Sequence, residues 1–174
     1  MKHFLATSVL FLSFFSLALN AEPIPLKGAS KAAAQQKALL IELTGKDDTK
    51  KSDVDLYSEI VASYQSQDLR GLRARVNTLL GSHPRSPFAD NALYLAGRQS
   101  LDQKKYTDAL RFFSRVTAEY PHSNRVVAAQ FAKAMTYKKM NLESQARKVF
   151  REIIQHYPGS PESFRADSEI RLLN

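Results

Sequence analysis

Residues 97–121 read GRQSLDQKKYTDALRFFSRVTAEYP, and residues 134–158 read AMTYKKMNLESQARKVFREIIQHYP. Each stretch begins with a small residue and has alanine 12 positions later, phenylalanine 4 positions after that and proline 8 positions further on. The two copies are 37 residues apart, since 134 − 97 = 37. A fixed period of this length is typical of arrays in which one supersecondary unit is stacked on copies of itself.

A four-residue turn motif marks the same period along the chain. It ends in serine each time and recurs at 120 − 83 = 37 and 157 − 120 = 37, as His83-Pro84-Arg85-Ser86, Tyr120-Pro121-His122-Ser123 and Tyr157-Pro158-Gly159-Ser160. A weaker copy precedes these, with the larger residues Ile60 and Leu72 at the small positions. We expect each proline to end a helix and each serine to cap the next one, with Pro87 and Pro161 at first helical positions.

The spacing suits a helical hairpin that packs on its neighbours. Small residues at Gly97 and Ala134 allow the first helix of a pair to approach the second, and Phe113 and Phe150 fill the space between hairpins. This order of small residues, aromatic and proline resembles tetratricopeptide repeats, whose usual period is about 34 residues. The predicted fold class is therefore all-α, a tandem tetratricopeptide-repeat solenoid of about three helical hairpins plus a C-terminal capping helix.

Hydrophobic periodicity and helix terminators predict the individual helices. A first helix is expected over 30–43, ended by Gly45. The hairpins and the last helix are expected over 52–67 and 68–80 with Gly81 as the stop, 86–102 and 107–119, 123–140 and 141–156, and 160–172.

The first 21 residues are typical of a secretory signal peptide. The apolar stretch over 4–19 is short for a membrane span, and small residues permit cleavage after Ala18 or Ala21. A retained anchor helix is the alternative. The predicted division is a signal peptide at 1–21, a short helix and linker at 22–51 and the repeat domain at 52–174, which we expect in the periplasm without stable membrane insertion. Because the sequence has no cysteine, we expect neither disulfides nor the lipid-acceptor residue of a bacterial lipoprotein.

The composition favours binding over catalysis. The formal net charge is +8, but the basic residues are dispersed, which favours an acidic protein partner or the anionic cell wall over nucleic acid. The four histidines do not have metal-ligand spacing, and no phosphate loop or nucleophile motif is present. We therefore expect no enzyme, no catalytic residue, no metal and no cofactor. Lysine pairs at 104–105 and 138–139 are either an edge for anionic polymer or solvated helix ends.

The resemblance to tetratricopeptide repeats implies an inner groove lined by the first helix of each pair. Carried over by register, its partner-binding residues are Tyr57, Tyr64, Asn91, Tyr94, Arg98, Leu101, Phe131, Met135 and Lys138. Tyr57, Tyr94 and Phe131 lie one period apart, so they form a ladder that suits a peptide with apolar side chains and some acidic character. The alternative is that packing between repeats buries these rings.

The Tyr-Pro-x-Ser turns, the period, the leader and the ending YPGSPESFRADSEIRLLN at 157–174 together resemble the TolA-binding family of the Tol-Pal system, also called the cell division coordinator CpoB or YbgF family. The resemblance covers 52–174 and implies an envelope scaffold with a TolA-like partner. That family has a long N-terminal coiled coil, whereas the helix expected over 30–43 spans two heptads, so oligomerisation stays open.

The favoured function is thus a non-catalytic periplasmic scaffold that coordinates cell division with the Tol-Pal system. An adaptor of outer-membrane protein assembly, similar to the lipoprotein BamD, and an accessory peptidoglycan-binding protein are the alternatives.

Overall fold

The computed structural model describes residues 35, 39 and 51–173 of the 174. The chain from Lys51 onward forms one compact unit, and this unit contains the repeats. The signal peptide expected over 1–21, and all but two residues of the helix expected over 30–43, lie outside the described residues.

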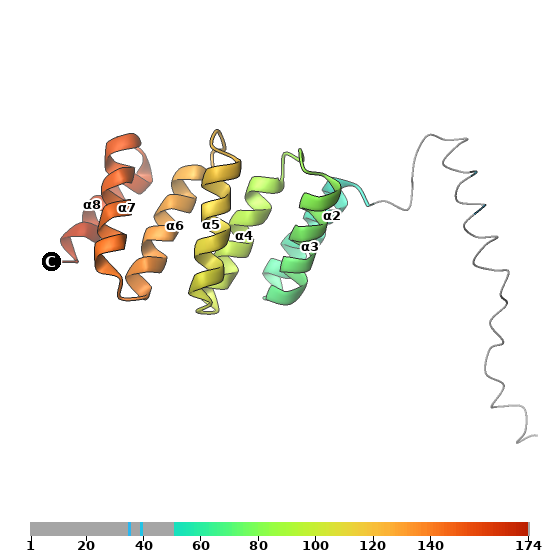
Figure 1. Cartoon of the computed structure of the whole chain (residues 1–174), viewed down its shortest axis with the longest axis horizontal. Coiled ribbons are helices and arrows are strands. Elements are labelled where there is room, and N and C mark those ends of the chain that lie inside the picture. Colours follow the sequence, from blue (N-terminus) through green and yellow to red (C-terminus); the bar gives the residue numbers. More distant parts are fainter. Residues whose placement is uncertain (1–34, 36–38, 40–50, 174) are drawn as a thin grey trace, which may run out of the picture. The chain divides into compact units, whose positions relative to one another are not determined.

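Seven helices and no strand make up the described residues 51–173, which confirms the all-α prediction. They are α2 (Asp53–Gln65), α3 (Leu69–Ser82), α4 (Ala89–Asp102), α5 (Tyr106–Glu119), α6 (Val126–Lys139), α7 (Glu143–His156) and α8 (Pro161–Arg171). In Figure 1 the helices follow one another in a row, from α2 and α3 at one end to α7 and α8 at the other. Each helix packs most closely on a neighbour in the chain, as tandem helical hairpins do.

The first helix of each hairpin belongs to an inner layer. The backbones of the inner helices α2, α4, α6 and α8 approach one another in sequence, whereas those of the outer helices α3, α5 and α7 stay further apart. The outer helix α3 reaches α5 through the long Arg73 side chain, which forms an ion pair with Asp108 at 2.7 Å. A stack whose first helices approach more closely than its second helices is concave on the side of the first helices. The inner helices therefore line the concave face.

The turns inside the three hairpins repeat one backbone conformation. Gln67, Lys104 and Asn141 have φ angles of 58°, 59° and 58°, and they are one period apart. In each turn the next residue donates its backbone N–H to the carbonyl five positions earlier, at 2.9 Å, 2.8 Å and 3.0 Å. This is the Schellman arrangement, which satisfies free carbonyls at the end of an inner helix and reverses the chain.

The serines between hairpins do not all cap helices, as the sequence analysis expected. The Ser86 hydroxyl donates to Asp53 at 2.9 Å, and the Ser123 hydroxyl donates to Asp90. These two serines therefore tie the start of one inner helix to the start of the next. The predictions that they cap helices, and that helices begin at 86 and 123, are wrong, because α4 and α6 begin three residues later.

The third turn serine behaves as expected. Ser160 is the N-cap of α8, its hydroxyl accepts the backbone N–H of Ser163 at 3.1 Å, and Pro161 stands at the first helical position. The carboxylate that would tie Ser160 to the preceding inner helix is missing, because Val127 occupies the position of Asp53 and Asp90. A further correction concerns Gly81, which does not stop α3, since the helix continues to Ser82.

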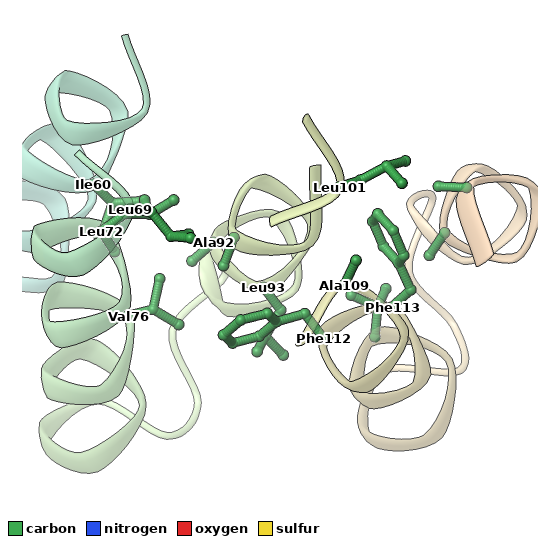
Figure 2. Packing of buried hydrophobic residues seen from close by; sticks show 14 of the residues in the cluster. Ile60, Leu69, Leu72, Val76, Ala92, Leu93, Leu101, Ala109, Phe112 and Phe113 are labelled. Atoms are coloured by element: carbon green, nitrogen blue, oxygen red, sulfur yellow. The ribbon is translucent and has the colours of Figure 1, made fainter. Parts of the chain in front are cut away.

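The core follows the predicted spacing of small and aromatic residues. A Cβ atom added to Gly97 would lie 2.5 Å from the Phe113 ring, so α4 requires glycine for this close approach to α5. Ala109 and Phe113 are fully buried, and the same holds for Ala146 and Phe150 one period later. Figure 2 shows Phe112 beside Leu93 in this cluster, on the side of α5 that carries the Arg73 contact. Phe112 therefore packs toward α3 of the preceding hairpin, and Phe113 packs on α4 of its own hairpin.

Candidate functional site

A hollow of about 230 Å³ lies on the concave face between α4, α6 and α8, and we call it the apolar hollow. Five of the nine predicted groove residues line it, namely Tyr94, Arg98, Leu101, Phe131 and Met135. Asp102, Lys139, Glu162 and Arg165 also line it and were not predicted. Ligand sites are commonly concave and mainly apolar with a few polar groups, and this hollow has that composition.

Aromatic and aliphatic side chains form the floor of the apolar hollow rather than free rungs. Phe131 is 6% exposed, and its ring lies 5.6 Å from that of Phe150, in a tilted arrangement. Leu101 is 9% exposed, and the Tyr94 ring lies 5.9 Å from Phe113. Packing within each hairpin therefore covers one side of each ring, and only the remaining surface can meet a ligand.

Three cations surround this floor. The Arg165 guanidinium lies 4.2 Å from the centre of the Phe131 ring, and Lys139 projects from the last turn of α6. A hydrogen bond to the Tyr94 hydroxyl raises the pKa of Arg98, with the nearby Asp102 carboxylate acting in the same direction, so the guanidinium stays charged. Within residues 51–173, none of these three cations takes part in an ion pair. Two carboxylates, Asp102 and Glu162, also line the hollow, so the formal net charge of its lining is 3 − 2 = +1.

A second hollow of about 360 Å³ lies between α2 and α4, and we call it the polar hollow. Its lining residues are Tyr64, Gln65, Gln67, Gln99, Asp102 and Gln103. The predicted groove residue Tyr64 is thus placed here, and Asp102 borders both hollows. Gln99 is 3% exposed, and neither polar atom of its carboxamide has a hydrogen-bond partner in the described structure.

The structure places the other three predicted groove residues outside both hollows. The Tyr57 ring stacks on Phe88 at 4.6 Å between centres, and its hydroxyl accepts a hydrogen bond from Asn91. Lys138 of α6 forms an ion pair with Glu169 of α8, at 2.6 Å. Tyr57 and Asn91 thus join α2 to α4, and Lys138 attaches α8.

Arg165 is the most informative residue that the sequence analysis missed. It lies two periods after Asn91, since 91 + 74 = 165, and Asn91 was assigned to the groove. The repeat register therefore indicated Arg165, but the last helix was interpreted only as a cap. If the period is extended through 160–172, α8 becomes a fourth inner helix and Arg165 takes the position of Asn91.

The described residues contain no group of three or more His, Asp or Glu side chains placed to hold a metal ion. None of the described helices combines the length and the hydropathy that a membrane span requires.

Comparison with known protein families gives a match that covers most of the chain. The family model YfiO, described as an outer membrane lipoprotein, matches residues 27–173. No curated protein sequence matches the chain at a significant level. The matched range contains both hollows and begins after the expected signal peptide.

Proposed function

The chain belongs to the YfiO family of outer membrane lipoproteins, and on this basis we propose that it is a non-catalytic envelope scaffold that holds a segment of a partner protein on its concave face. Family membership places it among envelope proteins built from tetratricopeptide-type interaction repeats. The proposed compartment is the periplasm, to which the leader would direct the chain before it is cleaved.

The apolar hollow is the observation that carries this proposal. Its floor of partly covered rings and aliphatic side chains offers apolar area, and apolar anchors supply most of the binding energy in protein interfaces. The cations Arg98, Lys139 and Arg165 at this floor favour a segment that carries a carboxylate beside its apolar side chain. The expected partner segment is therefore apolar and acidic.

A charge-reversal variant of the full chain tests the site. Lys139→Glu with Arg165→Glu removes two exposed cations from the apolar hollow. We expect binding of envelope proteins to fall at least about tenfold in affinity capture, because the acidic segment is then repelled. Lys148→Glu with Arg151→Glu on α7 is the matched control, with the same change of charge on exposed residues outside this hollow. Equal losses in the two variants would show a general charge effect and contradict the proposed site.

We propose that the scaffold coordinates cell division with the Tol-Pal system, on the basis of the Tyr-Pro-x-Ser turns and their period. Membership of the YfiO family equally favours an adaptor of outer-membrane protein assembly. Captured proteins separate the two: TolA favours the first, and barrel-assembly proteins without TolA contradict it. Sedimentation with purified peptidoglycan that disappears at moderate salt would instead favour wall binding.

A further inference from the structure

Gln99 is an exception among the residues at its register position. One period earlier stands Ala62, which has no polar side chain, and one period later stands Thr136, whose hydroxyl donates to the Ala132 carbonyl at 2.7 Å. Gln99 is nearly as buried as Thr136, but its carboxamide nitrogen and oxygen both lack a partner among the described residues. Buried polar groups are nearly always paired, so this amide points to a group that residues 51–173 do not supply.

The polar hollow limits what that group can be. Asp102 is the only charged residue in its lining, so an anionic ligand would be repelled. Gln103 already donates to the Gln67 carbonyl at 3.1 Å, which uses one of the few other polar groups at this point. A carboxamide presents one donor group beside one acceptor, and this is the complement of a peptide unit with its N–H and C=O.

The two hollows flank the same half of α4. Arg98, Leu101 and Asp102 face the apolar hollow, whereas Gln99 and Asp102 face the polar one. Arg98 lies close to Tyr94 of the apolar hollow and to Tyr64 of the polar hollow, and both tyrosines raise its pKa. An extended segment that anchors its side chains in the apolar hollow can therefore continue across α4.

From this arrangement we infer that the partner binds as an extended segment crossing α4, with one of its peptide units paired to the Gln99 carboxamide in the polar hollow. The inference rests on the proposed function, since it specifies how the same concave face recognises its partner. Side chains then determine the fit in the apolar hollow, and the main chain determines the fit in the polar hollow.

The first test compares stability and affinity in the full chain. The probe is a dodecapeptide selected from a random phage-displayed library on the immobilised chain, with its Kd measured by fluorescence anisotropy. Gln99→Met keeps the length of the side chain and removes the amide, so the melting temperature should rise while the affinity falls about tenfold. Gln130→Met on α6 is the control, because its carboxamide oxygen is also buried without a partner but lies outside both hollows. That variant should also gain stability and should keep its affinity.

The second test removes donors from the peptide instead. Single N-methylation of each peptide bond should reduce affinity about tenfold at one position on the unsubstituted chain, and this loss should vanish in Gln99→Met. The inference is overturned if Gln99→Met unfolds at a lower temperature, because the amide is then paired inside the protein, or if its affinity is unchanged.

The outcomes also separate this inference from the proposed function. A library that yields no binder, or a binder insensitive to Lys139→Glu with Arg165→Glu, contradicts both. A binder that is sensitive to that charge reversal and insensitive to Gln99→Met contradicts only the pairing of Gln99.

Discussion

The second hairpin, α4 and α5, and the third, α6 and α7, have the same ring geometry on different small residues. The ring centres of Tyr94 and Phe113 are 5.9 Å apart at 52°, and those of Phe131 and Phe150 are 5.6 Å apart at 54°. Yet the small position is glycine in the second hairpin and alanine in the third, and the added Cβ would collide with a ring only in the second. The repeat thus fixes where the aromatic pair lies, while each small residue is fitted to its own hairpin.

The two hairpins also differ in the turn that follows. Ser123 ties α6 to α4 through Asp90, whereas Ser160 caps α8 and has no carboxylate on α6 to reach. A turn of identical sequence pattern therefore has different partners, because the partner belongs to another repeat.

The largest expected effect tests whether the two aromatic cores are equivalent. Phe113→Ala and Phe150→Ala should each lower the free energy of unfolding by about 3–5 kcal/mol, since both rings are fully buried. Denaturant titration followed by circular dichroism measures both. A loss below about 1 kcal/mol in either variant would break the comparison, because that ring would then not be a core residue.

Exchanging the small residues should destabilise both hairpins. Gly97→Ala should cost about 1–3 kcal/mol through the clash with Phe113. Ala134→Gly should cost about 1 kcal/mol through the lower helix propensity of glycine. Phe113→Leu combined with Gly97→Ala should recover part of the first loss, which thermal unfolding can detect. If Gly97→Ala is neutral, α4 can move away from α5 and the glycine is not required.

A double-mutant cycle should separate the two turns. Ser123→Ala and Asp90→Ala should be coupled by about 0.5–1.5 kcal/mol, because the hydroxyl donates to that carboxylate. Ser160→Ala should cost about 1 kcal/mol as a lost N-cap, and it should be additive with Val127→Ala. Coupling in the second cycle, or its absence in the first, would contradict the assignment of the two serines.

The smallest effects should be gains in stability at the turns inside the hairpins. Lys104→Gly should raise the free energy of unfolding by about 0.5–1 kcal/mol, because a residue with a Cβ is strained at a φ of 59°. Asn141→Gly should gain only about a few tenths of a kcal/mol, since asparagine tolerates this region. A loss at position 104 would show that its side chain contributes more than its backbone strain costs.

The sequence was sufficient for the fold because the repeat makes each structural requirement visible twice. Gly97 and Ala134 beside Phe113 and Phe150 predicted the close approach of inner and outer helices, and the structure confirms it. The helix starts at 86 and 123 were wrong, because each serine bonds to a carboxylate 33 residues earlier, and local pattern contains no information on such a partner.

The site was predicted less well for a related reason. Register assigned Tyr94 and Phe131 to the groove, and both line the apolar hollow, but it could not show how far Phe150 and Arg165 cover the Phe131 ring. The burial of the unpaired Gln99 amide could not be predicted either, because a glutamine in a helix is normally exposed to solvent. The repeat spacing led to the correct fold, whereas the TolA-binding resemblance stays a prediction, since the family that matches is YfiO.

The ties between inner helices make the stiffness of the solenoid uneven. The first two junctions are fastened at the start of the inner helices, by Ser86 with Asp53 and by Ser123 with Asp90. The third is fastened near the opposite end, by the ion pair of Lys138 and Glu169. Near its start, α8 meets α6 through the Arg165 guanidinium on the Phe131 ring, a contact that tolerates sliding better than a hydroxyl–carboxylate bond does. The start of α8 can therefore tilt relative to α6 without rupture of any of these three bonds. Curvature should consequently adapt at the last junction, so that a bulky occupant bends the array there and leaves the rest of its arc unchanged.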